Sequence, residues 1–188
     1  MALYSEPHRH YHNLRHISDC LMEFDRLAAL AREPLAVELA IWFHDAVYDP
    51  RAGDNEERSA LLAREWLREA GAGPALPESV SQLVLATKAH GGTLHADAPL
   101  LVDIDLSILG QLPGRFWEYE EQIRREYDWV SVAVFCQKRA EILEGFLERG
   151  RIYLTDVVIG EREALARENL RTSVARLKRR SFWLANKY

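Results

Sequence analysis

Hydrophobic positions along this chain recur mainly at intervals of three and four residues, the spacing typical of amphipathic α-helices. No sustained alternation of apolar and polar residues, which would indicate strands, competes with it. A first helix is expected from about residue 7 to residue 31, with apolar side chains at helical spacing from Leu14 to Leu27. The segment LAVELAIWFHDAVY at 35–48 is apolar nearly all round, which predicts a helix buried in the centre of the domain and ended by Pro50 and Gly53.

The rest of the chain follows the same helical pattern. One helix is expected from Asp54 or Asn55, either of which can cap it, to Gly71, and another over 79–90, stopped by Gly91 and Gly92. Residues 98–109, APLLVDIDLSIL, fit a buried helix better than a strand. Long helices are expected near 113–128, 131–149 and 161–180. Because no repeat, low-complexity tract or long linker interrupts this order, we expect one all-α globular domain over residues 1–188.

Composition narrows the classes of protein that fit. The 188 residues are 48% hydrophobic and 28% charged, an ordinary globular balance, and the net charge of −5 provides no global basic field for long nucleic acids or acidic lipids. No apolar run approaches a membrane span, and the N-terminus lacks the apolar stretch of a secretory signal. Cys20 and Cys136 lie far apart in apolar helical contexts, so we expect two reduced, buried thiols and a cytosolic location.

Histidines are distributed unevenly. Four of the seven, at positions 8, 10, 12 and 16, crowd the first expected helix or its entry. On a helix, His12 and His16 share a face, which favours either a functional pair or simply a polar surface. His44 and Asp45 lie in an otherwise apolar helix, where each needs a partner because burying an unpaired polar group is costly. The pair is therefore either a ligand pair or a satisfied core histidine beside a surface aspartate.

Two aspartates pose the same problem in the apolar segment LLVDIDLSIL. Asp103 and Asp105 there indicate a ligand, a cap or a hydrogen-bonded pair, and Asp103 is expected to cap a short helix. Two histidines and two aspartates from three separated helices form a nitrogen and oxygen site that suits octahedral Mn, Fe, Co, Ni or Mg. The set does not resemble a closed structural zinc site, which would use thiolates.

The order H…HD…D on helices resembles the HD superfamily of metal-dependent phosphohydrolases. YHNLRHI at 11–17 is similar to a YHNxxHA segment of cyclic-nucleotide phosphodiesterases, which implies that His16 binds metal and His12 serves the phosphate and the leaving group. LATKAH at 85–90 is similar to their threonine-to-histidine stretch. IDLS at 104–107 resembles their ADLS and implies that Asp105, rather than Asp103, is the ligand.

A closer resemblance covers almost the whole chain. YSEPHRHYHNLRHI, WFHDAVYDP, NEERSA, TKAH, DIDLSILG, IRREY, RAEILEGFLERGRIYLTD and EREALARENL are similar to a bacterial group of predicted metal-dependent HD phosphohydrolases. Members of that group carry another helix before the YxEPxRxYH segment, which is not found here, so one wall of the active site is expected to differ. The resemblance implies an HD-type helical fold with metal ligands His16, His44, Asp45 and Asp105.

Further residues have candidate roles beside these ligands. Asp45 can also bridge to a second ion, and His90 is an extra acid, a ligand to a second metal, or a helix cap. Glu57 either holds a water molecule or the ring proton of a ligating histidine, or is a solvated residue in a first helical turn. Lys88 and Arg9 are either phosphate contacts or solvated surface residues.

The expected activity is hydrolysis of a phosphoester or phosphoanhydride bond in a nucleotide. A metal-bound hydroxide attacks the phosphorus, and His12 acts as general acid. The alternative is a nucleotide-binding or regulatory HD module with little turnover. The full ligand set favours the enzyme, because a binder needs no open metal beside an acid. The expected partner is therefore a small phosphorylated molecule, not a membrane or a long nucleic acid.

Overall fold

The computed structural model describes residues 2–89 and 95–185, and every regular element within these two ranges is a helix. The all-α prediction is therefore confirmed. Contacts group the chain into two compact units, residues 1–105 and 106–188, and each is described by itself. The expectation of one domain over the whole chain stays a prediction.

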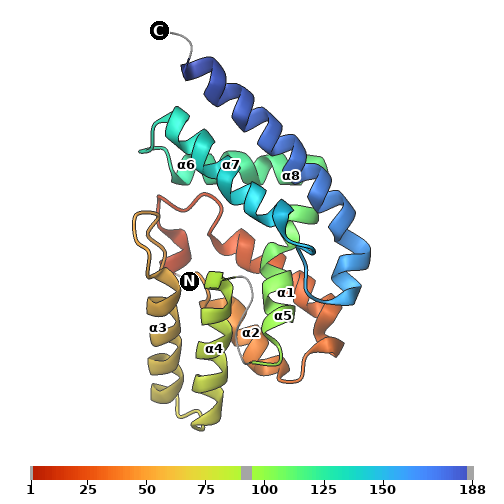
Figure 1. The fold of residues 1–188 in the computed structure, drawn as a ribbon. Helices are drawn as coiled ribbons and strands as arrows, with labels where there is room; N and C mark the ends of the chain where they lie inside the picture. Colours follow the sequence, from red (N-terminus) through yellow and green to blue (C-terminus); the bar gives the residue numbers. More distant parts are fainter. Residues whose placement is uncertain (1, 90–94, 186–188) are drawn as a thin grey trace. The chain divides into compact units, whose positions relative to one another are not determined.

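The first unit contains the elements that carry the candidate site. These are η1 (Ala2–Ser5), α1 (Leu14–Leu27), η2 (Ala28–Leu30), α2 (Pro34–Phe43), α3 (Asn55–Glu69), α4 (Ala75–Ala89) and α5 (Ala98–Asp105). Helix α4 packs against α2, α3 and α5, while α1 contacts α2 and α5. Figure 1 shows α3 and α4 running side by side.

The core of this unit is built from aliphatic side chains of four helices. Ile17 of α1, Ile41 of α2, Leu83 of α4 and Ile104 of α5 are completely buried. Burying a side chain of this kind stabilises the fold by about 1.5–3 kcal/mol. Since the candidate ligands lie on α1 and α5 and at the end of α2, the same packing that forms the core also fixes these elements against one another.

Helix α1 begins at Leu14, seven residues later than its expected start near residue 7. Asn13 is its N-cap, and the Asn13 side-chain oxygen accepts a hydrogen bond from the backbone N–H of Arg15 at 2.9 Å. This cap satisfies a donor that the first turn leaves without a helical partner. His12 therefore precedes the helix, and the expectation that His12 and His16 share one helical face is wrong.

Helix α2 ends at Phe43, so the expectation of a helix through residue 48 is also wrong. His44 occupies the C-cap position, and its backbone N–H still donates to the Ala40 carbonyl at 2.9 Å. The chain then turns, with the Ala46 N–H donating to the Phe43 carbonyl at 3.0 Å. The His44–Asp45 pair thus lies where a buried helix ends, not in its middle.

The ends of α3 agree with the sequence except in how the helix is capped. Asp54 occupies the N-cap position without a side-chain bond, while the Asn55 amide donates to the Asp49 carbonyl and its oxygen accepts from the Asp49 N–H. Gly71 follows the helix with a positive φ of 80°, a conformation that glycine adopts without steric cost. Helix α4 begins at Ala75, four residues before its expected start.

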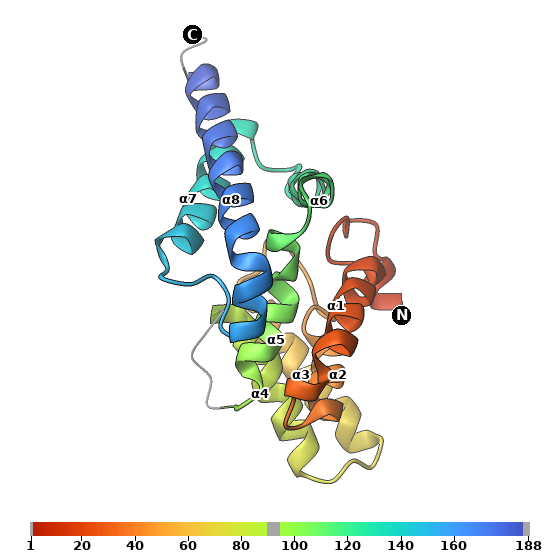
Figure 2. The same cartoon turned by 90° about the vertical axis from the view of Figure 1, so that its right-hand side faces the viewer.

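The second unit consists of η3 (Leu106–Gly110), α6 (Pro113–Glu126), α7 (Val132–Glu148) and α8 (Asp156–Ala185). Helices α7 and α8 lie side by side in Figure 2 and pack together. Their irregular connection is held by Glu163, whose carboxylate accepts from the backbone N–H groups of Ile152 and Tyr153 at 3.0–3.2 Å. Helix α8 is longer at both ends than the expected 161–180.

Among the described glycines of the second unit, Gly110 has the closest neighbours. A Cβ at this position would lie 2.7 Å from the Cβ of Arg162 and 2.8 Å from the hydroxyl oxygen of Tyr153. That hydroxyl donates to the Leu106 carbonyl at 3.2 Å, so it is not free to move away. Only glycine therefore allows η3 to approach α8 this closely.

Two further sequence expectations have structural counterparts. Cys20 and Cys136 are both buried and form no disulfide. None of the described helices is long and apolar enough to cross a membrane.

Candidate metal centre

Three elements of the first unit bring four candidate ligands to one point. His16 lies in the first turn of α1, His44 and Asp45 follow α2, and Asp105 is the last residue of α5. These elements contact one another in all three pairings. Although His44 and Asp45 are neighbours in the sequence, the turn after α2 brings Asp45 Oδ2 to 3.1 Å from His44 Nε2.

The ligand atoms are spaced as they are around a metal ion. His16 Nε2 lies 3.0 Å from His44 Nε2, 3.4 Å from Asp45 Oδ2 and 3.3 Å from Asp105 Oδ1. His44 Nε2 lies 3.5 Å from Asp105 Oδ1. With metal–ligand bonds of about 2.1 Å, neighbouring ligand atoms lie about 3.0 Å apart in an octahedron and about 3.4 Å apart in a tetrahedron. His16, His44 and Asp105 therefore group as possible ligands of one divalent ion, and Asp45 Oδ2 lies at similar spacing from the two histidine nitrogens.

Burial differs between the two kinds of ligand. The side chains of His16 and His44 are each 2% exposed, whereas those of Asp45 and Asp105 are 19% and 20% exposed. The imidazoles thus form the floor of the site and the carboxylates its solvent-facing side. Because only the carboxylates reach solvent, an ion held here would be approached from their side.

The orientation of His44 is fixed by its other ring nitrogen. His44 Nδ1 lies 2.9 Å from the carbonyl oxygen of Ile41, one turn earlier in α2. A carbonyl only accepts hydrogen bonds, so Nδ1 carries the proton and, in the neutral ring, the Nε2 lone pair points into the site. Metal-binding histidines usually show this second hydrogen bond.

Electrostatic interactions favour positive charge at the centre. Burial alone would raise the pKa of Asp45 and of Asp105, but the adjacent histidines lower both pKa values well below the ordinary range. Burial alone would likewise lower the pKa of His16 and of His44, yet their neighbours, including both carboxylates, raise these pKa values. A divalent cation would supply this positive charge in place of protons.

His12 lies beside the cluster without belonging to it. Its ring centroid is 6.0 Å from that of His16 and 4.2 Å from that of Tyr48, on which the imidazole stacks. Tyr48 also stacks against His8, whose Nε2 lies 3.0 Å from the Tyr48 carbonyl oxygen. The sequence did not single out Tyr48, although an aromatic residue three positions after the His44–Asp45 pair was the available signal.

Arg9, expected as a phosphate contact, is buried and bonded within the protein. Its guanidinium donates to the Glu6 carboxylate and to the backbone carbonyls of His12, Asp45 and Ala46 at 2.7–3.1 Å. Its side chain has no exposed surface. No local pattern predicts this arrangement, because it depends on where α2 ends.

Glu57 and Lys88 pair with each other at 2.5 Å on the surface of α3 and α4. Lys88 also donates to the Gly53 carbonyl at 2.8 Å, and its hydrogen bond lowers the pKa of the Glu57 carboxyl group. Their expected roles at substrate and water stay predictions. His90, the remaining candidate, lies outside the described residues.

Asp103 is completely buried within α5, two residues before Asp105. It lies in the second half of the helix, so it does not occupy the helix-starting position expected for a cap. Another buried aspartate, Asp97, which the sequence did not single out, instead binds the backbone before α2. Its carboxylate accepts from the backbone N–H groups of Arg32 and Glu33 at 2.7–3.1 Å, just before α2. Asp97 thereby supports the start of the helix whose end carries His44.

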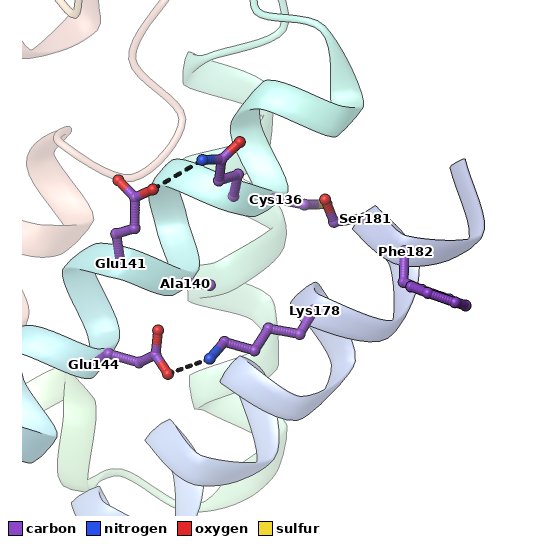
Figure 3. A pocket seen from close by; sticks show the side chains of 8 residues that line it. Cys136, Ala140, Glu141, Glu144, Lys178, Ser181 and Phe182 are labelled. Atoms are coloured by element: carbon purple, nitrogen blue, oxygen red, sulfur yellow. Dashed lines mark hydrogen bonds and ion pairs between the residues drawn. The ribbon is translucent and has the colours of Figure 1, made fainter. Parts of the chain in front are cut away.

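The second unit contains a separate pocket of about 310 Å³ between α7 and the last turns of α8. Its charged side chains are already paired, as Figure 3 shows: Lys178 bonds Glu144 at 2.5 Å, and Glu141 accepts from the Gln137 amide at 3.0 Å. None of the candidate site residues lines this pocket. The cluster on α1, α2 and α5 is therefore the stronger candidate for chemistry.

Comparisons with protein-family models, with curated proteins and with solved structures found no match to this chain. The HD-superfamily assignment accordingly stays a prediction from the motifs. The grouping of His16, His44 and Asp105 as metal-binding residues stands on geometry alone.

Proposed function

We propose that this chain is a metal-dependent phosphohydrolase of the HD type, cleaving a phosphoester or phosphoanhydride. One observation carries the proposal: two imidazole nitrogens and two carboxylates converge at spacings of 3.0–3.5 Å, with the carboxylate side reaching solvent. This ligand set suits Mn, Fe, Co, Ni or Mg.

Each side chain has a distinct role in this proposal. His16, His44, Asp45 and Asp105 hold the ion, which when bound supplies charge to lower the pKa of water and to polarise a phosphoryl oxygen. His12 donates a proton to the leaving oxygen as general acid. Tyr48 supports this role by stacking on the His12 ring and restricting its orientation.

The substrate class and the cellular location are proposed from separate observations. A nucleotide substrate rests on the resemblance of YHNLRHI and IDLS to phosphodiesterase motifs. A cytosolic location is supported by two buried cysteines that are not joined in a disulfide.

The test is a turnover screen of metal-stripped protein reloaded separately with Mn²⁺, Co²⁺, Ni²⁺ or Mg²⁺. Substrates would be nitrophenyl phosphate, bis-nitrophenyl phosphate and a panel of nucleoside mono-, di- and triphosphates and cyclic nucleotides. We expect metal-dependent release of phosphate or nitrophenol by the wild-type protein and none by His16→Ala. Metal binding with nucleotide affinity but no turnover would instead favour the regulatory module.

A further inference from the structure

Arg9 joins the two segments of the first unit that flank the candidate centre. One nitrogen of its guanidinium, Nη1, donates both to the His12 carbonyl at 3.0 Å and to the Asp45 carbonyl at 2.7 Å. The other terminal nitrogen, Nη2, donates to the Ala46 carbonyl at 3.1 Å. The segment that precedes α1 and the turn that follows α2 are thus tied to one planar group.

The turn after α2 explains why an arginine is needed here. The carbonyls of Asp45 and Ala46 follow the helix and lie outside its hydrogen bonds, and a buried carbonyl without a donor is costly. The fork of Arg9 supplies donors to two successive carbonyls just beyond the helix, and its positive charge complements the negative end of the helix dipole. Lysine has no comparable planar fork, so it would not span the same acceptors.

The environment of Arg9 holds its guanidinium in this one position. Its Nε donates to the Glu6 carboxylate at 2.8 Å, and its charge lies 5.2 Å from the Tyr4 ring centroid and 5.4 Å from the Tyr48 ring centroid. Because the Arg9 side chain has no exposed surface, its guanidinium cannot contact a phosphate. Its role is therefore within the protein.

We infer that Arg9 is a positioning residue for the metal centre: it sets Asp45 against the His12 segment, so metal affinity depends on it although it does not touch the ion. The inference rests on the proposed function for the meaning of His12, but its test needs only metal binding. Replacing a residue that orients a ligand typically weakens metal binding by about 10–100-fold.

The experiment compares Mn²⁺ dissociation constants by calorimetry for wild-type protein and Arg9→Lys, with folding of the metal-free proteins checked by circular dichroism. We expect Arg9→Lys to fold and to bind Mn²⁺ about 10–100-fold more weakly. Glu6→Gln replaces the half-exposed carboxylate that accepts from Arg9 Nε with a neutral amide. It should also weaken Mn²⁺ binding, but by less than Arg9→Lys does. This milder variant gives a result even where Arg9→Lys does not fold.

The matched control is Arg139→Lys. Arg139 is a second buried arginine, bonded to Glu120 and Tyr119 in the other unit at 2.6–3.2 Å. We expect the Arg139→Lys protein to lose thermal stability and to keep the wild-type Mn²⁺ affinity. Equal Mn²⁺ affinities in wild type, Arg9→Lys and Glu6→Gln, or an equal weakening in Arg9→Lys and Arg139→Lys, would overturn the inference.

The Mn²⁺ affinities, taken together with the turnover screen, separate this inference from the proposed function. Wild-type protein that binds Mn²⁺ but hydrolyses no phosphate ester would overturn the proposed function and leave the Arg9 comparison intact. Wild-type protein that binds no divalent ion would overturn both.

Discussion

His16 Nε2 and His44 Nε2 face each other at 3.0 Å in a buried site. Two N–H groups cannot point at each other at this distance, and His44 already uses its Nδ1 proton on the Ile41 carbonyl. In the absence of an ion, one shared proton can join the two nitrogens. A divalent ion would satisfy both lone pairs together with the carboxylates of Asp45 and Asp105.

The two aspartates of α5 should differ in their effect on metal binding. Asp105 Oδ1 lies 3.3 Å from His16 Nε2, whereas Asp103 is completely buried elsewhere on the helix. Asp105→Asn should lose the metal because a neutral amide replaces an anionic ligand, while Asp103→Asn should keep most of it. Metal content after gel filtration measures both. The reverse result would mean that the ligand register is misplaced by two residues.

His12 should affect turnover without affecting metal retention. Since His12 stacks on Tyr48 outside the ligand cluster, His12→Asn should keep the ion and lose about 10²–10⁴-fold in rate, as expected for a positioned proton donor. The loss in kcat should be smaller for a nitrophenyl ester, whose leaving group needs little protonation. Equal losses on good and poor leaving groups would reduce His12 to a residue that positions phosphate. Loss of the metal from the His12→Asn protein would mean that His12, and not His16, is the metal ligand.

Gly110 should be required for stability of the second unit. Gly110→Ala would place a methyl group 2.7 Å from the Arg162 Cβ, an overpacking that typically costs about 1–3 kcal/mol. Gly145→Ala in α7 is the control, because a Cβ there meets nothing within 4 Å, and it should leave stability unchanged or raise it. Urea unfolding would measure both free energies. A Gly110→Ala protein as stable as Gly145→Ala would show that η3 and α8 are less tightly packed than described.

Helical content and the approximate order of helices could be predicted because apolar periodicity determines them locally. Gly71 could be predicted to follow α3 because glycine is favoured just after a helix. The segment 98–109 could be predicted as buried and helical, although it forms α5 and then the 3-10 helix η3 rather than one helix. The start of α1 depends on the Asn13 cap, a local signal that competed with the apolar and histidine-rich residues before it. The end of α2 could not be predicted, because Arg9 bonds there to carbonyls 36 and 37 residues away, which no local pattern contains.

The candidate ligands could be chosen from the sequence because charged residues in apolar segments are rare unless they are paired. His44, Asp45 and Asp105 stood out in this way, and the structure brings them together with His16. The burial of Arg9 and the pairing of Glu57 with Lys88 were not predictable, since surface-type residues carry the same sequence signal whether they are solvated or bonded.

The most direct test is the divalent-metal content and metal-dependent stability of wild-type protein and His44→Ala, with His8→Ala as a histidine control outside the cluster. Wild type and His8→Ala should retain at least one ion per chain. After stripping, Mn²⁺ at 100 times its dissociation constant should stabilise them by about 2.7 kcal/mol. His44→Ala should retain no ion and show no Mn²⁺-dependent rise in Tm. Equal metal content and an equal rise in Tm in all three proteins would contradict a metal centre at His16, His44, Asp45 and Asp105.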